Sequence, residues 1–398
     1  MDVSKQRGSP EAVLWLWLAL AVLALFVAWL SGVNHDYSSY VQHWGLVLDA
    51  ANPWAVEHEG EPIDFNAYGP GNLALAPAML VGDIVPKLVL SLTALLIGLL
   101  ISAEAASQGT VGRDGWLSPG LLFAASPLVA VYVYGFGSND ILAAFAVVLA
   151  FRARARERYL LVGAALAIGA LVKFYPLLFV PFFAVSDTGR VRLRAFVSAV
   201  IVFIGGMAAA YLAWGESVLA PFLYAAEREP KMLSILRVLD PVSARVGGEA
   251  VVDVLINYNS IIVVATAALF ALYGTLARLD WRVTASTGIL LTLMAYKVGH
   301  PHFYIVWLVG FAWLGVQAEP ELRRLYTRAF APLAIFLSAF SLLLLASGFT
   351  DQDWYLHGPW RIARPIGAGI FTLLALYGLW QARSVLLKPP TRGFSLSW

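Results

Sequence analysis

Long apolar segments are the feature that most constrains how this chain can fold. Residues 12–30 form an unbroken apolar run without a charged side chain. A transmembrane helix needs about 20 predominantly apolar residues to cross the hydrocarbon core of a bilayer. The run follows a short polar start and lacks the small-residue cleavage site of a signal peptide, so we expect a first, retained span.

Similar apolar segments recur along the rest of the chain. The two that flank Lys173–Pro176 are short and predict a pair of broken half-spans. We therefore expect an all-α polytopic membrane protein with about 12 transmembrane helices. The segments lie at residues 84–101, 117–134, 141–151, 159–172, 177–186, 195–214, 255–277, 283–296, 303–317, 329–347 and 366–382.

The composition agrees with a membrane protein and excludes several other classes. Apolar residues make up 60% of the 398 residues and charged residues only 13%, against about 25% charged residues in a soluble domain. Because the chain has no cysteine, it has no disulfide framework, thiolate metal site or cysteine nucleophile. Gly135–Ser138 lacks the Gly-Lys-Ser/Thr ending of a phosphate-binding loop. We expect no cofactor, no bound metal and no nucleic-acid partner.

Charge is distributed unevenly between alternate loops. The loops on the side of both termini carry 18 of the 27 basic and 9 of the 25 acidic residues, a net charge of +9, and the other side carries −7. Positively charged loops remain in the cytoplasm, so we expect both termini to be cytoplasmic. The lack of an Asn-x-Ser/Thr sequon and the Ala/Arg-rich composition favour a bacterial or archaeal plasma membrane.

This orientation divides a single membrane domain into five parts. We expect an N-terminal span (1–31), an outer catalytic loop with an interfacial helix (32–83), central spans (84–214), a second outer loop (215–254) and C-terminal spans (255–398). A third outer loop is expected within the last part, at 349–365.

The first expected outer loop opens with an aspartate and a predicted helix. Asp36 stands where this helix would begin, a few residues beyond the first span. Its carboxylate fits two roles, an N-cap of the helix or a general base held at the membrane boundary. The apolar residues of the helix share one face and predict that it lies along the membrane surface; they are Tyr37, Tyr40, Val41, Trp44 and Leu48.

Three further polar clusters lie at expected outer helix ends. Asn139 and Asp140 suit a helix cap. Lys173 interrupts a long apolar stretch, which indicates either snorkelling to the interface or a partner such as a phosphate. Lys297, His300 and His302 crowd beside a helix-breaking proline and suit metal ligation, contact with a substrate phosphate or hydroxyl, or simple interfacial caps.

The order of these motifs resembles the multi-pass glycosyltransferases of the GT-C class, and most nearly their polyprenyl-phosphate-mannose-dependent branch. The resemblance covers about residues 32–185 and 295–310. It departs from the family pattern at Gly69, where a proline is usual, and in its single Asp36, where some branches have paired acids. The matching motifs are Asp36-Tyr37, Asn52-Pro53-Trp54, Tyr68-Gly69-Pro70, Gly137-Ser138-Asn139-Asp140, Arg152–Arg158, Lys173-Phe174-Tyr175-Pro176-Leu177-Leu178 and His300-Pro301-His302-Phe303-Tyr304.

The resemblance implies a membrane hexosyltransferase that acts on the outer face. Its donor would be a polyprenyl-phosphate sugar, with mannose as the expected sugar, and its acceptor a glycolipid or glycan, both in contact with membrane lipid. Asp36 would be the base of an inverting displacement, and His302 would stabilise the charge on the leaving phosphate. Substrate contacts would come from Lys173, Tyr175, Lys297, His300, Tyr37, Tyr68, Asn139 and Asp140, with further cations from the arginines of the late outer loops.

Other functions remain compatible with the same sequence. A multi-pass transporter or flippase of lipid-linked or small polar substrates is the main alternative. Such proteins often show internal repeats around a midplane site, whereas here no repeat is evident and the polar residues gather in outer loops. A lipid-linked glycan ligase or polymerase and a pentosyl- or glucosyltransferase of the same fold are further alternatives.

Overall fold

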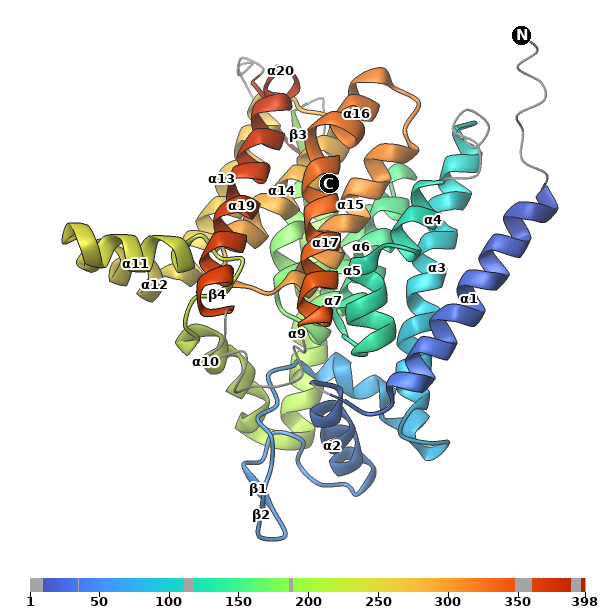
Figure 1. Cartoon of the computed structure of the whole chain (residues 1–398), viewed down its shortest axis with the longest axis vertical. Helices are drawn as coiled ribbons and strands as arrows, with labels where there is room; N and C mark the ends of the chain where they lie inside the picture. The colour runs from blue at the N-terminus through green and yellow to red at the C-terminus, as the bar shows by residue number, and fades with distance from the viewer. Residues whose placement is uncertain are drawn as a thin grey trace.

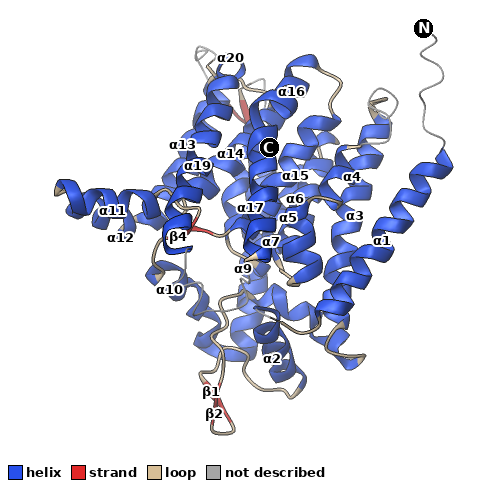
Figure 2. Cartoon of the chain, viewed as in Figure 1, coloured by secondary structure: helices blue, strands red, loops and turns tan. Residues whose placement is uncertain are grey.

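The computed structural model describes residues 10–34, 36–110, 118–185, 189–347, 360–387 and 395–397. Residues 1–9 and most of the expected loop at 349–365 lie outside these ranges. Most of the described structure is helical, and the strands are short pairs in loops (Figures 1 and 2).

The elements follow the apolar segments of the sequence closely. In chain order they are α1 (Pro10–Ser31), α2 (Asp36–Leu48), β1 (Glu57–His58), β2 (Glu61–Pro62), η2 (Pro70–Leu80), α3 (Val85–Ser107), α4 (Pro119–Ala124), α5 (Pro127–Val129), η3 (Ala130–Gly135), α6 (Asp140–Ala155), α7 (Tyr159–Val172), η4 (Tyr175–Phe179), α8 (Val180–Ala184), β3 (Arg190–Arg192), α9 (Leu193–Trp214), η5 (Gly215–Leu219), α10 (Ala220–Glu227), β4 (Lys231–Met232), α11 (Leu236–Val246), α12 (Glu249–Asn257), α13 (Asn259–Leu276), α14 (Trp281–Ala295), β5 (Val298–Gly299), η6 (Pro301–Phe303), α15 (Tyr304–Val316), α16 (Pro320–Arg324), η7 (Leu325–Phe330), α17 (Ala331–Ala346), α19 (Trp360–Gln381), α20 (Arg383–Leu386) and β6 (Ser395–Ser397).

The described helices include five that are long and apolar enough to cross a membrane. They cover residues 11–31, 85–107, 193–224, 259–276 and 320–346, and five shorter apolar helical segments accompany them. An all-α membrane protein is therefore confirmed. The number of about 12 spans stays a prediction, since several helices are too short to be assigned by length alone.

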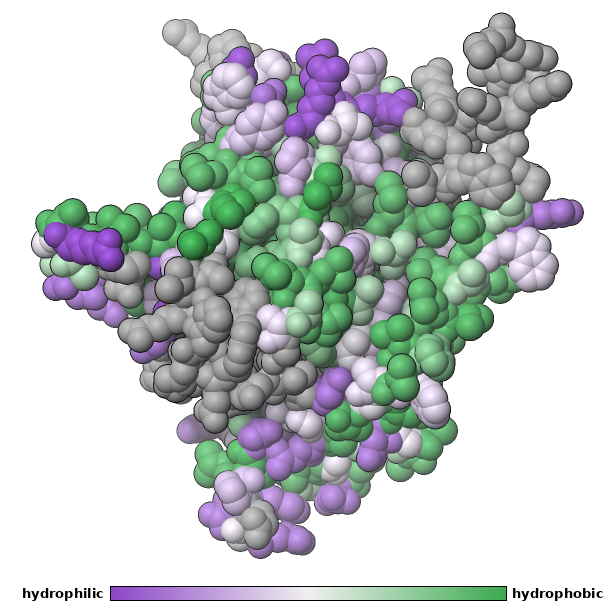
Figure 3. All heavy atoms as spheres, viewed as in Figure 1, coloured by the Kyte–Doolittle hydropathy of each residue, from purple (hydrophilic) through white to green (hydrophobic). Residues whose placement is uncertain are grey.

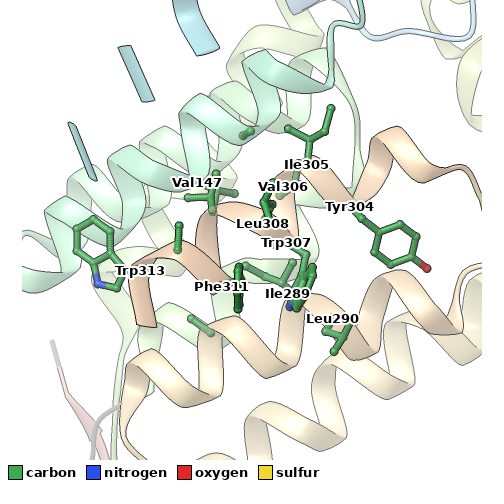
Figure 4. Close-up of a cluster of buried hydrophobic side chains, with 14 of the residues drawn as sticks. Val147, Ile289, Leu290, Tyr304, Ile305, Val306, Trp307, Leu308, Phe311 and Trp313 are labelled. Atoms are coloured by element: carbon green, nitrogen blue, oxygen red, sulfur yellow. The ribbon is translucent and has the colours of Figure 1, made fainter. Parts of the chain in front are cut away.

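The centre of the bundle is α15, whose side chains are buried throughout. It packs against α14 and α6, and Figure 4 shows Trp307, Leu308 and Phe311 interleaved with Ile289 of α14. Trp313 stacks on Phe151 of α6 with ring centroids 5.1 Å apart. A helix that is hydrophobic all round must be buried on every side, so its sequence already indicates this central position.

The outermost helices show the opposite pattern. Only 11% of the apolar window of α1 and 17% of that of α9 is buried. Large apolar side chains such as Trp15, Leu23 and Ile201 are more than half exposed. Apolar side chains cover much of the visible helical surface (Figure 3). Such a surface is stable in lipid, where exposed apolar groups carry no hydration cost.

The helix predicted at the start of the first outer loop is present as α2, but its apolar stripe does not face lipid. Tyr37, Tyr40 and Trp44 are buried against η2 and η5, in a cluster with Leu73, Ala76 and Val218. Leu48, at the end of the stripe, is 39% exposed. The expectation that this stripe faces lipid is therefore wrong, because an apolar stripe packs on protein as well as on lipid. The position of the helix at the membrane surface stays a prediction.

The bundle has two distinct ends. The hairpin β1–β2 and α2 form one end, and α16 and α20 lie at the other (Figure 1). The strand β6 pairs in parallel with β3 at this second end. The first residues of α1 also lie towards this end. We refer to the two as the α2 end and the β3–β6 end.

The charge distribution predicts that the α2 end faces the outside of the cell. The chain has no cysteine, so single substitutions Ser38→Cys in α2 and Ser107→Cys at the end of α3 give unique labels. Both serines are exposed, and they lie at opposite ends of the bundle. In intact cells an impermeant thiol reagent should label Ser38→Cys and not Ser107→Cys. The reverse pattern would invert the orientation.

Candidate active site

A cavity of about 550 Å³ opens near the α2 end of the bundle. Its walls come from α2, η4, α9, α10, α13, α14 and the loop that follows α14. One wall is polar and contains most of the chemically active side chains predicted from the sequence. This part of the lining consists of Asp36, Ser39, Tyr68, Lys173, Tyr175, Arg228, His300 and His302.

Most of the remaining cavity lining is apolar. It includes Leu177 and Leu178 of η4, Phe203 of α9 and Val264 of α13. Val264 is 52% exposed, so this wall continues onto the apolar outer surface of α13. The cavity thus has both polar and apolar lining, and its apolar part reaches the exposed surface of α13.

A buried carboxylate, Asp140, organises the polar wall. Its Oδ2 accepts hydrogen bonds from Lys173 Nζ at 2.6 Å and from Ser138 Oγ at 2.8 Å. Its Oδ1 accepts from the Tyr175 hydroxyl at 2.8 Å, and His302 Nε2 lies 3.7 Å from Oδ2. Asp140 itself is fully buried and does not line the cavity. It holds in place side chains that do.

Lys173 reaches Asp140 because the chain breaks where the sequence predicts. Helix α7 ends at Val172, Lys173 is extended, and Pro176 lies in the first turn of η4. The lysine side chain is 10% exposed, and its Nζ lies 5.2 Å and 5.0 Å from the ring centres of Tyr68 and Phe303. The ammonium group therefore has a carboxylate partner and two aromatic faces, an arrangement unlike snorkelling to water.

Two glycines bring the first loop against this break. The Gly69 N–H donates to the Val172 carbonyl at 3.0 Å. A Cβ on Gly69 would lie 2.3 Å from the Leu171 carbonyl oxygen, and one on Gly71 would lie 2.9 Å from the Leu171 carbonyl carbon. Only glycine allows this approach, which explains the departure from the family's proline at 69 and sets Tyr68 above Lys173.

Asp36 is the first residue of α2, is exposed, and lines the cavity. The next residue, Tyr37, fixes this end of the helix, because its hydroxyl donates to the Asp83 carbonyl at 2.6 Å and accepts from the Lys87 N–H at 3.0 Å. Burial, and then the charge of Asp36, raise the pKa of the Tyr68 phenol. Asp36 and Tyr68 line the same cavity.

The two histidines line the same cavity as Lys173. Their rings are stacked, with centroids 5.0 Å apart and planes 9° apart. Burial lowers the pKa of His300 well below its ordinary value, and the neighbouring His302, Arg228 and Lys231 lower it further. A neutral His300 accepts the hydrogen bond that Arg228 Nη2 makes to its Nε2 at 3.1 Å.

Arg228 is a site residue that the sequence analysis offered only as one of a group, the arginines of the late outer loops. It follows α10 in the expected second outer loop, and its guanidinium lies 5.2 Å from the ring centre of Tyr224. The sequence places it in a loop of mixed charge with no motif around it. Only the contact with His300, 72 residues away along the chain, reveals its position.

The predicted site residues fall into three groups. Asp36, Tyr68, Lys173, Tyr175, His300 and His302 line one cavity. Asp140 and Asn139 are buried behind it; Asn139 donates to Asn72 Oδ1 at 3.0 Å and accepts from the Tyr40 hydroxyl, and its side chain makes no capping bond to α6.

The remaining two predicted site residues are not brought to the cavity. Tyr37 lies on the buried face of α2 and is fully buried. Lys297 turns towards α12, where its Nζ lies 3.5 Å from the Ile256 carbonyl, and its backbone N–H donates to Asn259. Within the described ranges, no three His, Asp or Glu side chains are grouped as a metal site would require.

The buried ion pair generates a stability prediction. Asp140→Ala leaves Lys173 buried without its carboxylate, which should lower the free energy of unfolding by about 3–5 kcal/mol. The double variant Asp140→Leu/Lys173→Met replaces the pair by apolar groups and should recover most of this loss. Thermal unfolding of the detergent-solubilised protein measures both, with the exposed Asp49→Ala as the control. A double variant as unstable as, or less stable than, Asp140→Ala would contradict the pairing.

Comparison with known proteins assigns the chain to a family. Residues 66–295, more than half of the chain, match the model of glycosyltransferase family 87. This range includes Tyr68, Asp140, Lys173 and Arg228, whereas Asp36 precedes it and the two histidines follow it. Searches of curated proteins and of solved structures found no match. A glycosyltransferase with several apolar helices is a better description than the transporter alternative, and the chain belongs to glycosyltransferase family 87.

Proposed function

We propose that this glycosyltransferase moves a sugar, with mannose as the expected one, from a polyprenyl-phosphate donor to a glycolipid or glycan on the outer face of the membrane. One observation carries the proposal: a single cavity joins an apolar wall, continuous with the lipid-facing surface, to a cluster of cationic groups and an exposed carboxylate. A polyprenyl-phosphate sugar has matching parts: an apolar isoprenoid tail, an anionic phosphate and a polar sugar.

The donor tail fits the apolar wall and its phosphate the cationic part. Lys173 and Arg228 supply the cations, in place of the pair of Lys173 and Lys297 expected from the sequence. Arg228 is oriented by His300, and its buried Nε has no hydrogen-bond partner within the described structure. An arginine held in this way presents a planar set of donors suited to phosphate oxygens.

The chemical step follows from the same placement. Asp36 accepts the proton of the acceptor hydroxyl as that oxygen forms a bond to the anomeric carbon. The bond from this carbon to the phosphate oxygen breaks, and the polyprenyl phosphate leaves with the electron pair. Attack opposite the leaving group inverts the anomeric centre. His302, held beside Asp140, donates to the phosphate as its charge develops.

A reconstituted assay tests this function. The purified protein in liposomes is given radiolabelled polyprenyl-phosphate mannose and a membrane glycolipid extract, and transfer of label to the extract is measured. Transfer from the lipid-linked donor is expected. Transfer only from a nucleotide sugar would reject the donor class, and transfer from polyprenyl-phosphate glucose or pentose alone would reject mannose.

Asp36→Asn should abolish turnover while leaving the donor bound. Asparagine caps a helix about as well as aspartate but cannot accept the proton, so the rate should fall by about 10²–10⁴-fold. Donor Kd and single-turnover rate are measured together, with Asp49→Asn, an exposed residue just beyond the other end of α2, as the matched control. Turnover near that of the wild type with saturating substrates would remove Asp36 from the mechanism.

Arg228→Gln and His302→Ala should separate donor binding from chemistry. Loss of a charge-assisted hydrogen bond to phosphate should raise donor Kd by about tenfold or more in Arg228→Gln. His302→Ala should mainly slow the single-turnover rate, by about 10²-fold. Arg237→Gln in α11, outside the cavity lining, is the control. An unchanged donor Kd in Arg228→Gln, or an unchanged rate in His302→Ala, excludes that residue from its role.

A further inference from the structure

Two short helices project sideways from the bundle. Figure 1 shows α11 and α12 at its left edge, running across the direction of the central helices α15 and α17. Helix α11 ends at Val246 and is capped by Gly247, which takes the left-handed conformation with φ 73°. Gly248 then leads into α12. We call this pair the α11–α12 hairpin.

The hairpin is strongly amphipathic. Its exposed apolar side chains recur at helical spacing, and its charged side chains occupy the other face. In Figure 3 apolar atoms cover the upper side of the hairpin and polar atoms the lower side, which is turned towards the α2 end. The exposed apolar residues are Leu239, Val242, Val246, Val251 and Val254.

The apolar face continues into the lipid-facing wall of the bundle. Helix α13, a candidate span, begins at Asn259, two residues after α12 ends. Tyr258, between the two helices, is 57% exposed, and Ile261 and Val264 in the first turns of α13 are 65% and 52% exposed. A surface that adjoins a membrane span and shares its apolar character lies at the boundary of the same hydrocarbon layer.

We propose that the α11–α12 hairpin lies in the membrane interface at the α2 end, with its apolar face in the bilayer and its charged face in water. Amphipathic helices in this position bury their apolar face about 5–10 Å into the boundary between headgroups and acyl chains. The occupant of the face is thus lipid. The apolar face points along the spans, as lipid contact requires, and a second copy of the chain would have to approach from within the bilayer to cover it.

The hairpin is also tied to the cavity. The segment that leads into it pairs with the loop that carries His300: Lys231 N–H donates to the Lys297 carbonyl and Leu233 N–H to the Gly299 carbonyl, both at 3.0 Å. A Cβ on Gly299 would lie 2.5 Å from the Ser234 nitrogen, so the two strands are in close contact. Seating of the hairpin in lipid therefore restrains the cavity loop through β4 and β5.

Depth-dependent fluorescence quenching tests the position without reference to activity. Val246→Cys and Ala244→Cys place one thiol on each face of α11, because both residues are exposed and lie two positions apart on the helix. Each variant is labelled with bimane and reconstituted in liposomes of neutral lipid that contain a doxyl-labelled phospholipid. Ile261→Cys, 65% exposed in the first turn of α13 and outside the cavity lining, is the lipid-facing control, and Ser38→Cys is the aqueous one.

Quenching at Val246→Cys should approach that at Ile261→Cys and exceed that at Ala244→Cys by about twofold or more, as expected for an apolar face in the bilayer. Equal quenching on the two faces, or none at Val246→Cys while Ile261→Cys is quenched, overturns the proposal. So does disulfide cross-linking of Val246→Cys between chains in place of quenching, since it shows that a second copy covers the face. Quenching at Ile261→Cys also shows that the labelled bundle has folded and inserted.

Discussion

The buried carboxylate of Asp140 is the interaction on which the rest of the site depends. A charge in the interior of a helical bundle is tolerated only where other groups satisfy it. Here a lysine, a tyrosine and a serine donate to one aspartate; the serine lies just before α6, and the lysine and tyrosine lie together at the break between α7 and η4. Removing any one partner would leave a buried polar group unpaired. The network therefore fixes the relative positions of α6, the break after α7 and η4.

The cavity exists because the helices near Asp140 are interrupted. A continuous α7–α8 helix would keep its backbone groups paired internally and would carry Lys173 into the apolar interior or the lipid. The break turns the lysine towards the carboxylate, and Gly69 and Gly71 let the first loop pack directly on the exposed backbone of Leu171. Interrupted helices occur at membrane depth where protein or a cavity satisfies the released backbone groups, and both are present here.

The sequence predicts the helices and the break well because hydropathy and proline act locally. It also identifies most of the polar lining, since charged and histidine side chains within apolar segments are costly and need partners. The sequence does not predict which way a side chain points, and so it does not predict whether that side chain reaches the cavity. Lys297 and His300 are three residues apart, yet one turns to α12 and the other to the cavity. The stripe of α2 and the contact of Arg228 depend on tertiary packing, which neither spacing nor composition contains.

The environments of the two aspartates support the division of roles proposed for them. Asp140 is fully buried and already accepts hydrogen bonds on both carboxylate oxygens, so a proton from an acceptor would have to displace Lys173 or Tyr175. Asp36 is exposed at the start of α2 and faces the cavity, where an incoming hydroxyl can reach it. A base must be accessible to the proton that it takes. The buried aspartate thus suits the task of holding the cations and the histidine in place, and the exposed one suits catalysis.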